Sequence, residues 1–228
     1  MNNIEIISHP KCGRSWIWLM LLSYVNEVFN SPPSVTRAHK GSSGQNRKKQ
    51  YNNLIYTPHK YKINSPAIFL VRDPRDIMVS FYFWIHNRKK AYTKDLSSFI
   101  RSIYGIKYVS EFYKDWDTII KNNPNKLHLV RYEDLYKNTP KEIEKILRFY
   151  SFPIKDRYIK KIVQQHNFNS LVNRELKNQG NLPKEQRKFR EGKIGQYKQH
   201  FNRNDISFME KIMEAFPCDI TKHYLEDY

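Results

Sequence analysis

Residues 4–16 read Ile-Glu-Ile-Ile-Ser-His-Pro-Lys-Cys-Gly-Arg-Ser-Trp. The stretch 4–8 predicts a short buried strand, and the residues from Ser15 to about Phe29 predict a helix that is apolar nearly all round, as in a helix packed between a sheet and another layer. In the turn between them, Gly13 allows a tight bend and Lys11 adds a mobile positive charge beside the helix N-terminus. A phosphate-like anion suits such a turn. Its spacing is not the G-x-x-x-x-G-K-S/T of ATP- and GTP-binding loops, which disfavours a nucleoside triphosphate.

The same order of strand, turn and helix returns later in the chain. Strands are predicted at Val35–Ala38 and Ala67–Val71, the second being a continuous apolar run typical of the inside of a parallel sheet. Asp73 is a good N-cap and Pro74 a good first residue for a helix that reaches about residue 87. Further helices are expected at 95–104, 108–122, 139–150 and 157–165, and a strand at 127–131. This alternation predicts an α/β fold, a single domain over residues 1–228 with a parallel sheet flanked by helices.

A second anion site is expected where the third strand ends, because ligands of open parallel sheets bind beyond the carboxyl ends of the strands. Arg72 follows that strand directly, and Ser80 lies about two helical turns further on. Both side chains can donate hydrogen bonds to one phosphate. Two alternatives are an Arg72 paired with Asp73 or Asp76, and a Ser80 bonded to the carbonyl group four residues back.

Composition sets limits on function and location. With 40 Lys+Arg against 22 Asp+Glu, the formal charge is +18, which attracts anions. The N-terminal residues lack the basic flank and apolar run of a signal peptide, and no apolar stretch approaches the roughly 20 residues of a membrane span, so a cytoplasmic location is expected. Cys12 and Cys218 have no metal-ligand spacing and are interpreted as reduced thiols; no metal is expected.

Four segments, in order along the chain, resemble motifs of the cytosolic-type sulfotransferases, which use 3'-phosphoadenosine 5'-phosphosulfate (PAPS) as donor. The first, His9-Pro-Lys-Cys-Gly-Arg-Ser-Trp16, is similar to the family's Y/F-P-K-S/A-G-T-T/S-W loop. The second, Val71-Arg-Asp-Pro-Arg-Asp-Ile-Met-Val-Ser-Phe-Tyr-Phe83, is similar to R-N/D-P-K/R-D-x-x-x-S-x-Y. The others are Arg131-Tyr-Glu-Asp-Leu135, similar to Y-E-D-L/M, and Phe189-Arg-Glu-Gly-Lys-Ile-Gly-Gln-Tyr-Lys-Gln-His-Phe201, similar to R-K-G-x-x-G-D-W-K-x-x-F. The resemblance implies a short member of this family with its P-loop nucleotide-kinase-like fold, which releases 3'-phosphoadenosine 5'-phosphate (PAP).

The resemblance also implies roles for individual residues. Lys11 would contact the leaving phosphate. The 5' loop would consist of Cys12, Gly13, Arg14 and Ser15, with Arg14 in place of the family's usual Thr. Adenine would be contacted by Trp16 and Phe168, and Tyr132 would approach the adenine or its ribose. Phe168 belongs to a Gln-His-Asn-Phe run that places His166 at a position usually held by a hydroxyl residue. The 3'-phosphate would be bound by Arg72, Ser80, Arg190 and the backbone of Gly192; Glu191, which stands where the family has a Lys, removes one positive contact.

A general base must take the proton of the acceptor hydroxyl, and histidine suits this because much of it is neutral near pH 7. Val35-Thr-Arg-Ala-His-Lys40 resembles the family's K-T-H strand end, which makes His39 the expected base and puts Arg37 in the Lys position. His59 is the competing candidate. The expected acceptor is a hydroxyl-bearing small molecule or carbohydrate.

Two other functions compete with sulfuryl transfer. A non-catalytic nucleic-acid-binding protein would explain the +18 charge, but it leaves the two anion sites unexplained, so nucleic acid is not the expected partner. A nucleotide-dependent phosphotransferase would share the sheet, but the residue after Lys11 is not a Ser or Thr that could bind a metal ion.

Overall fold

The computed structural model describes residues 3–38 and 63–226. Contacts divide the chain into two compact units. Unit 1 consists of Met1–Val71 and Asp115–Val163, and unit 2 consists of Arg72–Lys114 and Gln164–Tyr228. Each unit is described by itself below.

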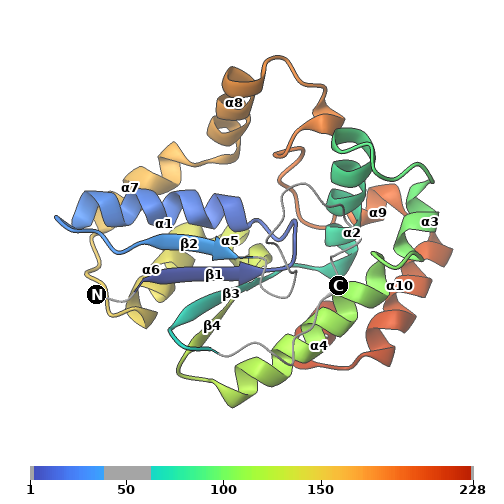
Figure 1. Cartoon of the computed structure of the whole chain (residues 1–228), viewed down its shortest axis with the longest axis horizontal. Helices are drawn as coiled ribbons and strands as arrows, with labels where there is room; N and C mark the ends of the chain where they lie inside the picture. The colour runs from blue at the N-terminus through green and yellow to red at the C-terminus, as the bar shows by residue number, and fades with distance from the viewer. Residues whose placement is uncertain (1–2, 39–62, 227–228) are drawn as a thin grey trace. The chain divides into compact units, whose positions relative to one another are not determined.

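Unit 1 is built on a parallel sheet of four strands among the described residues: β1 (Ile4–Ser8), β2 (Val35–Ala38), β3 (Ala67–Val71) and β4 (Leu127–Arg131). Their order across the sheet is β2-β1-β3-β4 (Figure 1). The register pairs Ile4 with Val35, Glu5 with Ala67, and Ala67 with Leu127. All four strands have the bounds expected from the sequence, and the predicted α/β class with a parallel sheet is confirmed.

Helices cover this sheet. The first, α1 (Arg14–Val28), packs on β1 and β2 (Figure 1), while α5 (Tyr132–Lys137) and α6 (Thr139–Phe149) pack on β4. Every residue of β3 is buried, and Phe69 stacks on Trp116 of α4 (Ile106–Asn122) with ring centroids 4.7 Å apart. An apolar run such as Ala67–Val71 therefore occupies the centre of the sheet, where neither face meets water.

The described part of unit 2 is helical. It begins with α2 (Pro74–Phe83), which continues into a π-helical turn, η3 (Trp84–Arg88). The Asp73 carboxylate accepts the Arg75 N–H and Pro74 is the first helical residue, as the sequence predicts. The remaining elements are α3 (Leu96–Ile100), the first part of α4, α8 (Phe168–Gln179), η4 (Lys184–Gln186), α9 (Tyr197–His200), α10 (Arg203–Ala215) and α11 (Asp219–Glu226).

The helix expected over 95–104 ends at Ile100, which corrects the prediction. The Ser102 hydroxyl donates to the Phe99 carbonyl oxygen at 2.8 Å, and such a local bond competes with the helical ladder. A side chain at Gly105 would lie 2.1 Å from the Ile100 carbonyl oxygen, so the turn requires glycine there. In the described residues, no helix has both the length and the apolar character that crossing a membrane requires.

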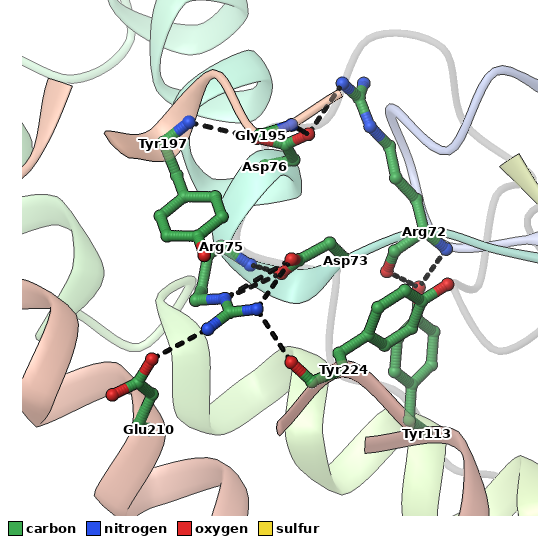
Figure 2. A network of polar contacts seen from close by, with 9 residues as sticks. All are labelled: Arg72, Asp73, Arg75, Asp76, Tyr113, Gly195, Tyr197, Glu210 and Tyr224. Atoms are coloured by element: carbon green, nitrogen blue, oxygen red, sulfur yellow. Dashed lines mark hydrogen bonds and ion pairs between the residues drawn. The ribbon is translucent and has the colours of Figure 1, made fainter. Parts of the chain in front are cut away.

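Arg75 joins three helices inside unit 2 (Figure 2). Its side chain is 2% exposed, and it donates to the Asp73 carboxylate through Nε and Nη2, at 3.1 and 2.9 Å. It also donates to Glu210 of α10 at 2.7 Å and to the Tyr224 carbonyl oxygen of α11 at 2.8 Å. The guanidinium carbon lies 4.3 Å from the centroid of the Tyr197 ring. One buried cation thus connects the start of α2 to the C-terminal helices.

Candidate functional site

The turn after β1 has the backbone that an anion-binding loop needs. Lys11 and Gly13 both adopt positive φ, 73° and 91°, and the Gly13 carbonyl oxygen accepts the Trp16 N–H at 2.9 Å, which starts α1. The predicted succession of strand, turn and helix is therefore confirmed here. The positive end of the α1 dipole lies directly behind the turn.

Tyr132, the first residue of α5, lies against this turn. A Cβ atom at Gly13 would be 2.7 Å from Tyr132 Cδ2, a distance too short for a side chain. Trp16 meets the same tyrosine edge-on, with ring centroids 5.9 Å apart. Three residues predicted for the site, from two segments more than 100 positions apart in the sequence, are thus brought together in unit 1.

Positive charge gathers at the start of α1. Arg37 of β2 donates from Nη1 to Ser15 Oγ at 3.1 Å, and its guanidinium lies 4.2 Å from the Trp18 ring centroid. Burial lowers the pKa of Arg14 to about 10; Cys12 acts in the opposite direction, and the charge of Arg37 adds to the lowering. Cationic groups that burial destabilises are stabilised when an anion binds beside them.

His9, at the start of the turn, has no role assigned from the sequence. Its Nδ1 donates to the Pro10 carbonyl oxygen at 2.8 Å, and burial lowers its pKa to about 4. The ring is therefore neutral at pH 7. The two candidate bases, His39 and His59, lie outside the described residues.

In unit 2, Arg72 is buried and held at both its backbone and its side chain (Figure 2). Its N–H donates to the Tyr113 hydroxyl at 2.9 Å, and that hydroxyl donates to the Arg72 carbonyl oxygen at 2.8 Å. The guanidinium donates from Nη2 to the Lys193 carbonyl oxygen at 2.8 Å and lies 3.4 Å from Asp76 Oδ2. The ion pair between Arg72 and Asp76, one of the alternatives to phosphate binding that the sequence left open for Arg72, is therefore present. Ser80 lies half-buried on α2.

Two buried carboxylates hold segment 188–197, which carries the other predicted 3'-phosphate residues. Glu175 of α8 accepts the N–H groups of Lys188 and Phe189 at 2.8 and 3.0 Å and pairs with Arg88 at 2.7 Å. At the other end, Asp76 accepts the N–H groups of Gly195 and Tyr197 at 2.9 and 3.0 Å (Figure 2). Burial raises the pKa of Asp76, although Arg72 and these two donors act in the opposite direction.

These two carboxylates were missed as site residues. For Asp76, the signal is its place in the Arg-Asp-Pro-Arg-Asp segment, but the sequence suggested only a local pairing with Arg72. Glu175 binds a backbone 13 residues away and an arginine 87 residues away, and no local pattern indicates either partner.

Arg190 makes several contacts within the held segment. Nη1 donates to Glu191 Oε1 at 3.2 Å, Nη2 donates to Gln196 Oε1, and the guanidinium carbon lies 4.2 Å from the Phe83 ring centroid. Lys184 of η4 lies 3.0 Å from the same Glu191 oxygen. Neither Phe83 nor Gln196 was assigned a role in the site from the sequence.

Gly192 and Phe168, both predicted for the site, lie in contact. Gly192 has φ +62°, and a Cβ atom there would be 2.3 Å from Phe168 Cδ2. Phe168 is the first residue of α8, and Asn167 caps that helix by accepting the Ser170 N–H at 2.9 Å. The buried His166 comes just before this cap, and burial lowers its pKa, with the charge of Arg174 adding to the effect.

The electrostatics of unit 2 favour a strongly charged anion. Burial lowers the pKa of Arg190; Glu191 opposes this, and the positive charge of Arg72 adds to it. Two largely buried guanidinium groups that repel each other form a favourable environment for a phosphate dianion. Within residues 3–38 and 63–226, no group of three or more His, Cys, Asp or Glu side chains is placed to hold a metal ion.

Comparison with known proteins finds a family model that matches almost the whole length of the chain. The model of the sulfotransferase domain matches residues 2–224. Among characterised sequences, the chain is 25% identical over 235 residues to Sulfotransferase 6B1 of Danio rerio, which covers 94% of this chain and 78% of that protein. It is 23% identical over 253 residues to Flavonol 4'-sulfotransferase of Flaveria chlorifolia, with 93% and 78% covered.

A solved structure shows the same fold. Mouse sulfotransferase SULT7A1, crystallised with PAP, superposes with a TM-score of 0.73 at 16% identity, covering 100% of this chain and 88% of that one. The predicted fold class of helices around a parallel sheet is thereby confirmed at the level of the whole chain.

Proposed function

The chain belongs to the sulfotransferase domain family, and from that premise we propose that it transfers the sulfuryl group of PAPS to a hydroxyl acceptor by in-line displacement. The observation that carries the proposal is the family match over residues 2–224. The anion-binding features of both units support it.

In unit 1, the turn after β1 is proposed to bind the 5'-phosphosulfate. Negative charge grows on the leaving phosphate as its bond to sulfur breaks, and Lys11 with the α1 N-terminus would stabilise that charge. Gly13 keeps the turn free of a side chain, and the backbone of Cys12, Arg14 and Ser15 shapes the rest of it. Trp16 and Tyr132, which meet beside the turn, are proposed to contact the adenosine moiety.

In unit 2, Arg72, Ser80, Arg190 and the backbone of Gly192 are proposed to bind the 3'-phosphate. The mutual proximity of the two buried guanidinium groups supports this assignment, because a dianion would relieve their repulsion. Phe168, packed on Gly192, is proposed to contact adenine.

The proposed chemical step uses one base. His39, two residues after Arg37, would take the proton of the acceptor hydroxyl as its oxygen forms a bond to sulfur. The bond between sulfur and the bridging phosphate oxygen breaks at the same time, and its electron pair leaves with PAP. The imidazolium then returns its proton to solvent, so that no redox partner is needed.

The donor assignment is tested by calorimetric titration with PAP. We expect saturable binding by the wild-type chain. Arg72→Ala should weaken the binding of PAPS much more than the binding of adenosine 5'-phosphosulfate, which lacks the 3'-phosphate. If Arg72→Ala weakens the binding of both nucleotides equally, Arg72 does not bind the 3'-phosphate. If the wild-type chain binds neither PAP nor PAPS, the assignment of PAPS as donor is overturned. Binding to DNA or RNA that depends steeply on salt, with no response to PAPS, would favour the nucleic-acid alternative instead.

The base is tested by comparing two histidines. His39→Ala should lower the transfer rate by about 10²–10⁴-fold and leave PAP affinity nearly unchanged, as expected for removal of a general base. His59→Ala is the matched control. An active His39→Ala enzyme beside an inactive His59→Ala enzyme would assign the role to His59.

The acceptor is proposed to be a hydroxyl-bearing small molecule or a carbohydrate. Similarity to a protein named as a flavonol sulfotransferase supports an acceptor with a hydroxyl group. A panel of phenols, alcohols and sugars with labelled PAPS would identify the class, since only true acceptors gain the label. The cytoplasmic location and the absence of a metal requirement stay predictions.

A further inference from the structure

The Glu191 carboxylate contacts Arg190, one of the residues proposed to bind the 3'-phosphate. Its Oε1 accepts from Arg190 Nη1 at 3.2 Å, and its side chain is 12% exposed. Burial raises the pKa of Glu191, but Lys184 and Arg190 outweigh it and lower the pKa overall, so the group is ionised at pH 7. An ionised carboxylate therefore lies where a bound phosphate needs positive potential.

The backbone segment that carries Glu191 is anchored on both sides. Glu175 holds the backbone at residues 188 and 189, and Asp76 holds it at residues 195 and 197. Glu191 lies between these two anchors. Because Glu191 Oε1 occupies Arg190 Nη1 in this anchored segment, an incoming phosphate must compete with Glu191 for that guanidinium.

Lys184 limits this competition. Its ammonium group lies 3.0 Å from the same Glu191 oxygen, and its side chain is 56% exposed. It neutralises part of the carboxylate charge from the solvent side. Arg190 also keeps its contacts with Gln196 and Phe83, so the guanidinium stays in place when Glu191 is displaced.

We propose that Glu191 is an affinity-determining residue that weakens binding of the donor's 3'-phosphate by occupying Arg190, and that Lys184 partly cancels this effect. The inference rests on the proposed function. Its physical basis is Coulombic, because a unit negative charge near a phosphate dianion opposes binding in proportion to both charges. Binding of nucleotides that lack a 3'-phosphate is not weakened by the Glu191 charge in this way.

Glu191→Gln is the decisive variant, since it removes the charge and keeps the shape and a hydrogen-bonding oxygen. We expect its affinity for PAP to rise roughly three- to tenfold, as a partly screened charge interaction allows. Its affinity for adenosine 5'-phosphate should stay unchanged. Lys184→Met should lower PAP affinity, and adding it to Glu191→Gln should have little further effect, because the charge that Lys184 neutralises is then absent.

Glu226→Gln is the matched control. It removes one negative charge from the same unit, where Glu226 pairs with Lys222 at 3.5 Å on an exposed face of α11. Equal gains from Glu226→Gln and Glu191→Gln would show an effect of net charge and overturn the inference. Unchanged or weaker PAP binding by a folded Glu191→Gln, beside a wild type that binds PAP, would overturn the inference alone. If neither protein binds PAP, the proposed function fails as well.

Discussion

Replacing Arg75 with Met should destabilise the protein strongly although the substitution creates no large cavity. Met retains most of the aliphatic stem, so the packing loss is small. What is lost is a guanidinium that donates to the Asp73 carboxylate through Nε and Nη2, and a donor to the Tyr224 carbonyl oxygen. The Asp73 side chain is 3% exposed, so water does not replace the two side-chain donors that it loses, and the Arg75 N–H stays bonded to it.

The magnitude follows from this burial. Removing one partner of a buried ion pair costs about 3–5 kcal/mol, because the charge that remains buried loses the compensation which that partner gave. The pair with Glu210 adds little, since that carboxylate is 36% exposed and screened by water. For a chain of this length, the loss corresponds to a fall in Tm of roughly 6–20 °C. Urea denaturation followed by circular dichroism measures the free energy directly.

Arg148→Met provides the control. Arg148 donates twice to Glu144, but its side chain is 66% exposed, so its loss should change stability by less than about 0.5 kcal/mol. Adding Asp73→Asn to Arg75→Met should cost less than the sum of the two single changes, because it removes the buried charge that Arg75 compensates in the wild type. A loss below about 1 kcal/mol for Arg75→Met would refute the reasoning that this buried network stabilises unit 2.

Three further predictions concern the two candidate phosphate sites. Gly13→Ala forces an alanine into φ +91° and against Tyr132, so it should lower the free energy of unfolding by more than about 1 kcal/mol in urea denaturation and weaken PAP binding. A variant with wild-type stability and wild-type PAP affinity would contradict the requirement for glycine at position 13. Gly192→Ala must displace Phe168, so calorimetry should show lower PAP affinity, and an unchanged value would argue against contact of Phe168 with the nucleotide. For Glu175, burial alone raises the pKa, but the N–H groups of segment 188–189 and the Arg88 contact lower it overall. Its stabilisation is therefore complete above the ordinary glutamate value of 4.5 and is lost as pH falls through the lower folded-state pKa, and Glu175→Gln should reduce this acid dependence of urea stability.

Much of unit 1 could be predicted from local sequence. The apolar run of β3 and the Pro-Lys-Cys-Gly turn can be recognised locally, because a continuous apolar run and a glycine that permits a tight turn each involve only a few adjacent residues. The Asp73 cap and Pro74 fixed the start of α2 in the same way. The end of α2 was harder to predict, since no local sequence pattern indicates the π-helical turn at Trp84–Arg88.

The helices after residue 166 were not predicted from the sequence. Segment 176–204 contains eight Lys and Arg residues against Glu185 and Glu191, so it looks like a basic loop when read alone. The positions of these helices depend on long-range contacts of Glu175, Asp76 and Arg75, which join groups between 13 and 149 residues apart in the chain. Single-sequence patterns contain no information about such pairings.

The sequence by itself determined the strands, the glycine turn, the excess of positive charge and the family motifs, because each depends on residue type and short spacing. Only the tertiary structure decided which groups surround the predicted ligands. It placed Tyr132 on Gly13, the 188–197 backbone between Glu175 and Asp76, and the Glu191 carboxylate on Arg190. The physical reason is that burial and electrostatic compensation depend on distances through space, which residues far apart in the chain acquire only when it folds.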